Sequence, residues 1–461
     1  MCGVFGIRAP GRDVARVAHF GLHALQHRGQ ESAGIAVSDG GRLTVLRDMG
    51  LVAQVFSEQN LRGLRGELAI AHTRYSTTGS TQWSNAQPLV QHGRTRTIAL
   101  GHNGNLTNAT ELRAELTAAG VKLGSTSDTE LIAALIANDS APLEEAVASA
   151  MAQLEGAYSV TALSEGRLLA FRDPHGFRPL CLGRLGEDWV VASETCALDL
   201  IGAEFEREVE LGELLVIDDE GCRSVRAVPQ ADGGARCIFE FFYLARPDSR
   251  LDGVEVHGAR IRMGAQLAQE APVEADLVLP IPDSGTPAAI GFSRASGIPF
   301  SEGLIKNRYV GRTFIQPDQE LREQGIRLKY NPLGEVRGKR VVVIDDSIVR
   351  GNTTRQLVRM LFDSGAPEVH VRISSPPIVS PCFYGIDFAD EDQLIAANRS
   401  VEEVREHIGA TSLAYLSLQG LQESTRRPES SFCRACLTRE YPTRVPGDYR
   451  LAKLRFEPAR A

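Results

Sequence analysis

The second residue of the chain, Cys2, has the features of an N-terminal nucleophile. Removal of Met1 leaves a thiol and a free α-amino group on one residue. That amine has an ordinary pKa of about 7.7 to 8, so it can act as the general base for its own side chain. A lone cysteine is more often a small core residue, and only the position of Cys2 favours catalysis. We expect a single methionine cleavage to mature the protein.

A thiol that attacks a carboxamide needs hydrogen-bond donors for the tetrahedral oxyanion. The segment 101–106, GHNGNL, offers the side-chain amide of Asn103 and the backbone N–H of Gly104. A glycine at this place lets the backbone approach closely. An Asn-Gly pair by itself more often marks a hairpin turn, so the segment indicates chemistry only in combination with Cys2.

A second group of polar residues follows an apolar run in the other half of the chain. The segment 341–354, VVVIDDSIVRGNTT, places Asp345 and Asp346 at the end of an expected buried strand, before a loop that opens a helix. The exposed N–H groups and the dipole at such a helix start favour a phosphate, and ligands of α/β sheets gather at these strand ends. The competing interpretation is a strand followed by a capped helix with no ligand. It could explain the acidic pair or the loop alone, but it explains the whole segment poorly.

Two different patterns of secondary structure must position these residues. Up to about residue 225, short strand-like runs end at Gly, Asn or Asp and alternate with capped helical patterns, which predicts stacked sheets with helices. From residue 275 onward, strand and helix alternate, which predicts a parallel sheet covered by helices. The polar, turn-rich segment 228–234 is typical of a linker. We therefore predict domains at 2–230 and 231–461. The expected strands are 35–40, 66–76, 96–106, 157–173, 188–195, 275–282, 340–346 and 368–375, and the expected helices are 107–120, 127–138, 286–297 and 353–366.

The composition agrees with two globular domains and excludes several classes of partner. A chain of 461 residues exceeds what one core usually organises, and 43% hydrophobic with 23% charged residues is ordinary for a folded protein. The net charge of -8 argues against nucleic acid as a partner. No apolar run can cross a bilayer, and the start MCGVFGIRAP lacks a secretory signal, so we expect a cytoplasmic protein with eight reduced cysteines and no membrane partner.

The first half resembles the class II glutamine amidotransferase domain of the N-terminal nucleophile hydrolases. The resemblance rests on CGVFG at 2–6, HRGQES at 27–32, HTRYS at 72–76, HNGN at 102–105 and SDTE at 127–130. It implies an α+β fold with an αββα sandwich, catalysis by Cys2, and glutamine binding by Arg28, Arg74 and Asp128. Opposite fixed charges suit the amino-acid zwitterion. For Arg28, a supporting residue near the nucleophile, a surface guanidinium is the competing interpretation.

The second half resembles the type I phosphoribosyltransferases, which are α/β proteins with a parallel sheet. The resemblance implies that Asp345 and Asp346 grip the ribose hydroxyls and one Mg²⁺ per subunit, with Ser284 of the pyrophosphate loop 282–286 near the metal. The 5-phosphate of phosphoribosylpyrophosphate would lie on the loop and helix start formed by Ser347, Arg350, Gly351, Asn352, Thr353 and Thr354.

The stretch 306–333 resembles a lid that closes over the donor and helps to form a path for ammonia. We predict that Lys306, Arg308 and Arg312 are recruited on closure. Solvated loop charge is the alternative interpretation of these residues.

Four of the cysteines suggest a metal site. Cys433 and Cys436 have the spacing of metal ligands, although one pair cannot complete a four-ligand site. Together with Cys237 and Cys382, their contexts resemble the iron–sulfur subgroup of the glutamine phosphoribosylpyrophosphate amidotransferases, which implies one structural [4Fe-4S] cluster per subunit. Zinc at the same four sulfurs fits the sequence nearly as well.

Taken together, the resemblances imply an enzyme that hydrolyses glutamine and channels ammonia to phosphoribosylpyrophosphate. The expected products are 5-phosphoribosylamine, glutamate and pyrophosphate, in the first step of de novo purine synthesis. The alternatives are a non-enzymatic phosphoribosylpyrophosphate-sensing regulator and another class II amidotransferase synthase. An intact Cys2 and acidic pair disfavour the first, and VVVIDDSIVRGNTT in place of sugar-isomerase repeats disfavours the second. A homotetramer and inhibition by purine nucleotides are further expectations from the resemblance.

Overall fold

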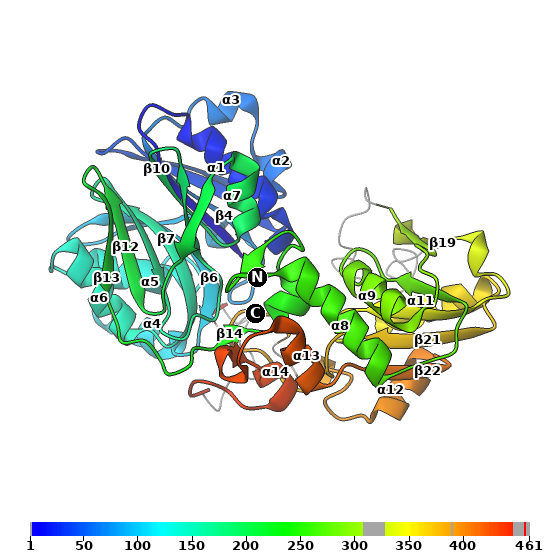
Figure 1. The fold of residues 1–461 in the computed structure, drawn as a ribbon. Coiled ribbons are helices and arrows are strands. Elements are labelled where there is room, and N and C mark those ends of the chain that lie inside the picture. Colours follow the sequence, from blue (N-terminus) through cyan, green and yellow to red (C-terminus); the bar gives the residue numbers. More distant parts are fainter. Residues whose placement is uncertain (1, 308–327, 389–390, 446–455, 458–461) are drawn as a thin grey trace.

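The computed structural model of the protein describes residues 2–307, 328–388, 391–445 and 456–457. Arg308 and Arg312, expected to belong to the lid, lie outside the described residues. Figure 1 shows a two-sheet sandwich formed by the first half beside a smaller sheet formed by the second half. Among the described residues, no helix is long and apolar enough to span a bilayer.

The first half contains two stacked antiparallel sheets. The seven-stranded sheet has the order β11-β9-β10-β1-β4-β2-β3, and the six-stranded sheet has the order β13-β12-β8-β7-β6-β5. The strands of the first are β1 (Gly3–Arg8), β2 (Ser32–Ser38), β3 (Leu43–Met49), β4 (Leu68–Arg74), β9 (Cys181–Leu185), β10 (Asp188–Ala192) and β11 (Glu204–Glu208). Those of the second are β5 (Leu89–His92), β6 (Thr97–Leu106), β7 (Gly156–Ser164), β8 (Arg167–Arg172), β12 (Glu213–Asp218) and β13 (Gly221–Arg226).

Helices cover the outer face of each sheet. The alternation of side chains along β1 shows why: Phe5 and Ile7 pack with α1, whereas Val4 packs against Leu168 of the other sheet. These layers confirm the predicted αββα sandwich. The seven-stranded sheet is covered by α1 (Val14–Ala24), α2 (Val52–Val55), α3 (Glu58–Leu61) and α7 (Thr195–Ile201), and the six-stranded sheet by α4 (Ala109–Ala118), α5 (Thr129–Asn138) and α6 (Leu143–Gln153).

The second half is built on a four-stranded parallel sheet of order β17-β20-β21-β22. Alternate residues of β20 enter two separate cores: Val342 packs with α8 and α9, and Val343 packs with α11 and α12. Helices on both faces confirm the predicted α/β class. The strands are β17 (Leu277–Pro280), β20 (Arg340–Asp345), β21 (Glu368–Ile373) and β22 (Ser412–Tyr415), and the helices are α8 (Val256–Glu270), α9 (Thr286–Ser296), α11 (Asn352–Asp363), α12 (Val401–Ile408) and α13 (Leu418–Thr425).

Short elements join the two halves and the end of the chain. β14 (Arg236–Cys237) pairs in parallel with β23 (Phe432–Cys433), so the start of the second half lies beside its last segment. A π-helix, Glu240–Leu244, begins shortly after β14. The predicted domain boundary at residue 230 stays a prediction. The remaining elements are the ribbons β15 (Arg250–Leu251) with β16 (Val254–Glu255) and β18 (Leu304–Lys306) with β19 (Tyr330–Pro332), the helix α14 (Ala435–Thr438), and 3-10 turns at Gln26–Arg28, Trp83–Asn85, Gly334–Val336, Glu391–Gln393 and Glu429–Ser431.

Candidate active site

Cys2 lies at the start of β1, which pairs with β4 on one side and β10 on the other. Its backbone nitrogen is 3.3 Å from Oδ1 of Asn103, and its Sγ is 3.6 Å from the carbonyl oxygen of Tyr75. Burial raises the pKa of the Cys2 thiol above its ordinary value. The thiol therefore needs a local base to become a nucleophile at neutral pH.

Asn103 and Gly104 lie on β6 and face Cys2 across the two sheets. The side-chain nitrogen Nδ2 of Asn103 is buried and has no hydrogen-bond partner in the described part of the chain. An unused buried donor is costly unless a ligand satisfies it. Gly104 has a φ of 155°, and a Cβ there would come within 1.9 Å of the carbonyl oxygen of Ala157. The pair thus has the properties of an oxyanion site: a free donor and a backbone that only glycine can form.

A small cavity of about 10 Å³ joins Cys2 to Arg74 and Asp128, two of the three residues predicted to bind glutamine. Such a volume holds one water molecule, so a substrate as large as glutamine requires the surrounding loop to move. Cys2, Gly104, Arg74 and Asp128 all line it, so the structure brings these four predicted residues together. The other lining residues are Tyr75, Ser76, Thr77, Thr78, Gln87, His102, Ser127 and Thr129.

Arg74 holds the loop that closes this cavity. Its guanidinium donates to the carbonyl oxygens of Thr78 at 3.1 Å, Gly79 at 3.3 Å and Ser80 at 3.2 Å. Burial lowers the pKa of Arg74, and its only acidic hydrogen-bond partner in the described residues is Glu31, at 3.4 Å. A substrate carboxylate would replace carbonyl oxygens with a charged acceptor, which is the stronger bond for a guanidinium.

Asp128 lines the same cavity. Its Oδ2 accepts from the backbone nitrogen of Leu106 at 2.9 Å, and its Oδ1 is 3.9 Å from Nδ1 of His102. The carboxylate is thus fixed by the strand that also carries Asn103 and Gly104. The predicted role of Asp128 in binding the α-amino group stays a prediction.

Arg28, predicted to bind glutamine, is not among the residues that line the cavity. Its Nε donates to the carbonyl oxygen of Cys2 at 2.9 Å, and its other nitrogens donate to Glu194 and Glu240. Only 1% of the Arg28 side chain is exposed, so the competing interpretation as a surface guanidinium is wrong. The structure places Arg28 behind the nucleophile.

The predicted acidic pair of the second half lies at the carboxyl end of β20. Burial, and for Asp345 also the negative charge of Asp346, raises the pKa of both carboxyls. The hydroxyl of Ser347 donates to Asp346 at 2.5 Å, and that of Ser284 also hydrogen-bonds this carboxylate. A Cβ on Gly285 would lie 2.5 Å from the carbonyl oxygen of Ile344, so the loop 282–286 packs tightly against this strand end. The structure therefore brings Ser284 to the acidic pair.

The loop after the acidic pair leads into α11, as predicted. Gly351 precedes the helix with a φ of 77°, and Asn352, Thr353 and Thr354 form its first turn. Arg350 hydrogen-bonds Gln393, and Lys306 forms an ion pair with Asp283 of the loop 282–286. The N–H groups at the start of a 12-residue helix can hold a phosphate.

The four cysteines of the predicted cluster come together in the structure. Cys237 and Cys433 are partners in the pairing of β14 with β23, and Cys436 follows in α14. Burial raises the pKa of Cys436, and nearby Cys237, Cys382 and Cys433 raise it further. In the described parts of the chain, however, no group of three or more His, Cys, Asp or Glu side chains is arranged to hold a metal ion. The predictions of Mg²⁺ and of an iron–sulfur cluster therefore stay predictions.

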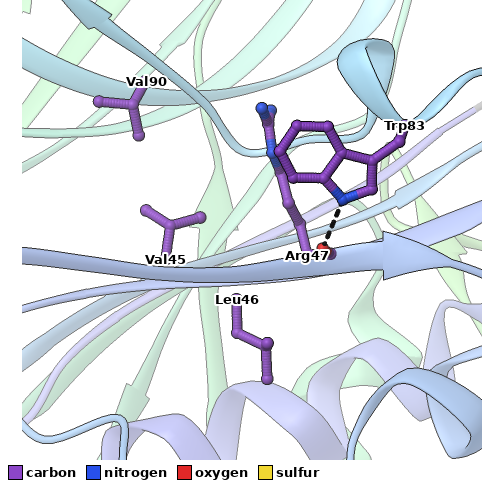
Figure 2. A pocket seen from close by; sticks show the side chains of 5 residues that line it. All are labelled: Val45, Leu46, Arg47, Trp83 and Val90. Carbon is purple, nitrogen blue, oxygen red and sulfur yellow. Dashed lines mark hydrogen bonds between the residues drawn. The ribbon is translucent and has the colours of Figure 1, made fainter.

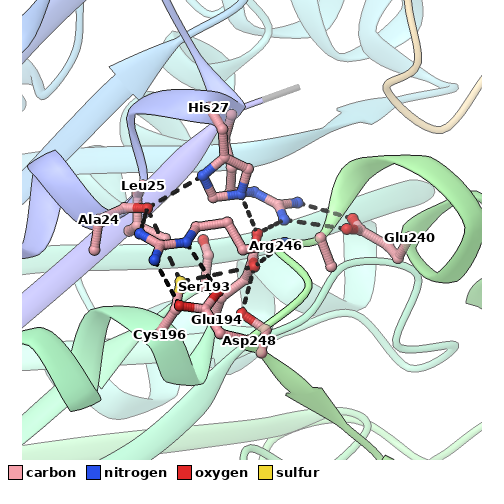
Figure 3. Close-up of polar contacts among 12 residues, drawn as sticks. Ala24, Leu25, His27, Ser193, Glu194, Cys196, Glu240, Arg246 and Asp248 are labelled. Carbon is pink, nitrogen blue, oxygen red and sulfur yellow. Dashed lines mark hydrogen bonds and ion pairs between the residues drawn. The ribbon is translucent and has the colours of Figure 1, made fainter. Parts of the chain in front are cut away.

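Sequence reasoning missed three buried polar residues at these sites. Gln87 bridges the site by accepting from the backbone nitrogen of His102 at 2.8 Å and donating to Thr129 at 2.9 Å. Glu194 and Glu240, both labelled in Figure 3, accept hydrogen bonds from Arg28. The sequence offers one signal for such residues, an acidic residue within an apolar run, as in CIFEFFYL. A carboxylate that is buried in such a run needs a partner, so its presence predicts a buried ion pair.

A larger opening on the sandwich, about 390 Å³, is lined by other residues. Figure 2 shows the Arg47 guanidinium over the ring of Trp83, at 4.9 Å from its centre, with the apolar side chains of Val45 and Val90 nearby. The described residues that line this opening include no nucleophile, acid or neutral base. It is therefore not a candidate for the chemistry at Cys2.

Comparisons with known proteins cover both halves of the chain. The glutamine amidotransferase domain family matches residues 72–200. A protein of Mycobacterium tuberculosis named amidophosphoribosyltransferase is 53% identical over 466 residues, which cover 98% of this chain and 88% of that protein. The solved structure of glutamine phosphoribosylpyrophosphate amidotransferase from B. subtilis, complexed with ADP and GMP, matches with a TM-score of 0.91 and 48% identity, over 97% of this chain and 98% of that chain. A structure described as the allosteric regulatory enzyme of purine biosynthesis matches with a TM-score of 0.93 and 47% identity, over 98% of both chains.

Proposed function

The chain belongs to the amidophosphoribosyltransferase family, and from this premise we propose that Cys2 is the residue that hydrolyses its glutamine. The activity is that of the family: an enzyme of the glycosyltransferase class that transfers nitrogen from glutamine to phosphoribosylpyrophosphate in purine biosynthesis. Matches over nearly the whole chain leave no support for a sensor without activity or for a synthase with a different acceptor.

The observation that carries the assignment is the contact of Asn103 with Cys2. Oδ1 of Asn103 accepts from the Cys2 nitrogen at 3.3 Å, while the buried Nδ2 of Asn103 has no partner among the described residues. The first bond orients the amine that removal of Met1 would free, and the second group is ready to donate to an oxyanion. Base, nucleophile and oxyanion donor thus meet at one place.

The chemistry follows from these groups. The α-amine of Cys2 takes the thiol proton, and the sulfur attacks the carboxamide carbon of glutamine. Asn103 and the Gly104 N–H stabilise the resulting oxyanion. The protonated amine gives its proton to the leaving ammonia, and water then hydrolyses the thioester to release glutamate. Arg74 and Asp128 hold the two charged groups of the amino acid during these steps.

Ammonia is used in the second half, at the end of β20. It attacks C1 of phosphoribosylpyrophosphate and displaces pyrophosphate, giving 5-phosphoribosylamine. We propose that Asp345 and Asp346 bind the ribose hydroxyls and that the turn from Ser347 to Thr354 holds the 5-phosphate. Lys306, with Arg308 and Arg312, would be recruited from the segment 306–333. Unchanged kinetics in Lys306→Ala would contradict that role.

One Mg²⁺ per subunit fits the acidic pair. Two buried carboxylates with raised pKa values and the hydroxyl of Ser284 are hard oxygen ligands without a full set of opposite charges. When bound, the ion would supply positive charge to the pyrophosphate leaving group. Asp345, Asp346 and Ser284 are the residues that we propose to hold it.

One [4Fe-4S] cluster per subunit is our proposal for Cys237, Cys382, Cys433 and Cys436. The four thiols are free. Cys237, Cys382 and Cys433 lie close enough to Cys436 to raise its pKa. Their segments come from the start, middle and end of the second half, so a cluster would tie these segments together. Zinc is the competing occupant.

Further proposals concern assembly, regulation and location. The B. subtilis enzyme was solved with ADP and GMP, and we propose purine nucleotides as inhibitors of this chain as well. A homotetramer, a cytoplasmic location, domains at 2–230 and 231–461, and the absence of nucleic-acid and membrane partners are proposed on the sequence grounds above.

The experiment that tests the nucleophile compares the wild type with Cys2→Ser. Release of glutamate and pyrophosphate is measured with glutamine, and then with ammonium chloride as the nitrogen donor. We expect the variant to lose glutamine-dependent turnover and keep ammonium-dependent turnover, because only the first uses the thiol. Glutamine-dependent turnover by the variant, or Met1 intact on fully active wild type, would contradict the assignment.

A further inference from the structure

We propose that Glu240, a residue of the second half, is a positioning residue for the Cys2 nucleophile and acts through Arg28. The inference rests on the proposed role of Cys2. It assigns to Glu240 the task of fixing the Arg28 guanidinium against the carbonyl oxygen of Cys2.

The contacts form a short chain of bonds. Arg28 Nε donates to the Cys2 carbonyl oxygen at 2.9 Å. Nη2 and Nη1 of the same guanidinium donate to Oε1 and Oε2 of Glu240, at 2.8 Å and 3.1 Å. This two-bond pairing fixes the plane of the guanidinium, and the side chains are 1% and 0% exposed. The orientation of Glu240 therefore sets where Nε points, and Nε holds the backbone of the nucleophile.

Glu194, the other carboxylate on Arg28, has several further donors to satisfy. It contacts only Nη1 of Arg28 and accepts from the Ser249 hydroxyl at 2.6 Å. It also accepts from His27 at 2.8 Å and from the backbone nitrogen of Arg246 at 2.9 Å, and both of these residues are labelled in Figure 3. Glu194 neutralises charge, but one contact does not fix a planar group. Glu240 supplies the orientation.

The charges around Glu240 are balanced within the buried network. Burial alone would lower the pKa of Arg28, and the charges of Glu240 and Glu194 more than offset it and hold that pKa above its ordinary value. Glu240 also lies 3.5 Å from Arg178, whose Nε donates to the carbonyl oxygen of Tyr384 at 2.9 Å. Loss of the Glu240 charge would leave two buried guanidinium groups with one carboxylate, so Arg28 would shift.

The backbone that carries Glu240 is itself held firmly. Glu240 begins the π-helix Glu240–Leu244, an unusual turn that often occurs at functional sites. Arg260 of α8 donates to the carbonyl oxygens of Phe241 at 2.7 Å and Ala245 at 2.8 Å. The same guanidinium attracts the carboxylate of Asp346. The turn that carries Glu240 and the acidic pair of the phosphoribosyl site therefore interact with the same arginine.

The expected effect separates the two reactions of the enzyme. A small misplacement of a nucleophile lowers the rate of attack by about 10- to 100-fold. Glutamine-dependent kcat should fall by that factor in Glu240→Gln, with the KM for glutamine changed less than about threefold, because Arg74 and Asp128 still bind the substrate. Ammonium-dependent turnover should stay the same, since it does not use Cys2.

Glu208 offers a matched control. This carboxylate also joins the two halves, by bonds to Arg172 of β8 at 3.3 Å, to Arg236 of β14 and to the backbone nitrogen of Asp252 at 2.6 Å. Glu208→Gln removes a comparable interdomain charge from a cluster built on other arginines. It should lower the unfolding temperature without changing the ratio of glutamine-dependent to ammonium-dependent rates.

The test uses full-length enzyme with both nitrogen donors, the unfolding midpoint and the rate of Cys2 alkylation by iodoacetamide, followed by peptide mass spectrometry. Glu240→Asp keeps the charge and withdraws the oxygens by one methylene, so it remains informative if Glu240→Gln unfolds. A lower rate ratio and altered Cys2 alkylation in the Glu240 variants alone support the proposal.

Two outcomes would overturn it: a rate ratio within twofold of wild type in the folded Glu240 variants, or equal losses of both rates in step with the midpoint. The absence of glutamine-dependent turnover in the wild type would instead contradict the proposed function, on which the inference rests. The two failures are thus distinguishable.

Discussion

The side-chain oxygen of Asn103 lies 3.3 Å from the backbone nitrogen of Cys2, and the amide nitrogen of the same side chain is buried without a partner among the described residues. One amide can therefore serve the base with its oxygen and the oxyanion with its nitrogen. In Asn103→Asp the acceptor is kept and the donor is lost. We expect glutamine-dependent kcat to fall by about 10²- to 10³-fold, the usual effect of removing one oxyanion donor.

Steady-state rates with glutamine and with ammonium chloride check this first prediction. Asn108→Asp is a suitable control, because Asn108 lies beyond β6, at the N-cap of α4. A variant Asn103→Asp that keeps more than half of the wild-type glutamine kcat would contradict the oxyanion role. Equal loss of ammonium-dependent turnover would indicate a fold defect instead.

The buried residue His72 predicts a specific acid sensitivity. Burial lowers the pKa of His72 from 6.5 to about 3. Between these values, the unfolded chain binds a proton at this residue that the folded protein does not bind, so stability falls as the pH falls. Within that window, His72 lowers the free energy of unfolding by about 1.4 kcal/mol for each pH unit of acidification. Above pH 6.5 this effect disappears, because neither state is protonated there.

Urea unfolding between pH 4.5 and pH 7.5 (about two units below and one above the ordinary histidine pKa) measures this effect. In His72→Gln the amide can still donate to the carbonyl oxygen of His102, which His72 contacts at 3.0 Å. We expect a shallower decline of the unfolding free energy below pH 6.5 than in the wild type. The exposed His92 provides the control His92→Gln. Identical slopes for wild type and His72→Gln would show that His72 does not titrate as described.

The acidic pair predicts a gain of stability when one carboxylate is removed. Burial and the neighbouring charge raise the pKa of Asp345 above 3.8, so folding becomes less favourable as the pH rises through and above that value. Asp345→Asn should therefore unfold at a higher temperature than the wild type at pH about 7.5 without divalent cations, well above the ordinary carboxyl pKa.

Addition of Mg²⁺ with phosphoribosylpyrophosphate should reverse this order. The ligands should stabilise the wild type and leave the stability of Asp345→Asn nearly unchanged. In this variant, the rate of transfer with either nitrogen donor should fall by about 10- to 100-fold, because one charge-assisted contact is lost. Thermal unfolding with and without the ligands measures both effects. Equal stabilisation of the two proteins would argue against Mg²⁺ binding by Asp345.

Local sequence patterns predicted the fold well because each half repeats one simple arrangement. Alternating apolar residues such as Phe5 and Ile7 on one face and Val4 on the other specify a sheet buried on both sides. In the second half, the uninterrupted apolar run of β20 and the amphipathic α11 specify a parallel sheet under helices. These signals are local, so the chain itself carries them.

The site was predictable only where a motif fixes the role of a residue. Cys2, Gly104, Arg74 and Asp128 line one cavity, as the motifs implied. The position of Arg28 behind Cys2 depends on Glu240, more than 200 residues away in the sequence. No local pattern records a pairing across two halves, because it is created only when the halves pack together.

Glu457 predicts a contribution of the C-terminal segment to glutamine affinity. Its Oε1 accepts from the backbone nitrogen of Ser80 at 2.8 Å and from the Thr126 hydroxyl at 2.6 Å. Ser80 belongs to the loop whose carbonyl oxygens accept hydrogen bonds from Arg74, and this loop leaves little space for substrate. Glu457→Ala should ease the opening of this loop and lower the KM for glutamine by about two- to fivefold, as expected for one hydrogen bond. Glu440→Ala, in the same terminal region, is the control, and an increased KM in Glu457→Ala would refute the prediction.

The four clustered cysteines predict iron in protein purified without oxygen. Cys237 and Cys433 are partners across a two-stranded pairing, so a cluster on their thiolates would hold the start of the second half to its end. We expect about four irons per chain with broad visible absorption, as a [4Fe-4S] cluster requires. Cys433→Ser should lose both and show faster hydrogen exchange in β14 and β23, whereas Cys222→Ser, at a half-buried thiol of β13, should keep them. One zinc per chain without visible absorption would show that zinc, and not an iron–sulfur cluster, occupies the four cysteines. Normal protection from hydrogen exchange in metal-free Cys433→Ser would contradict a structural role for the metal.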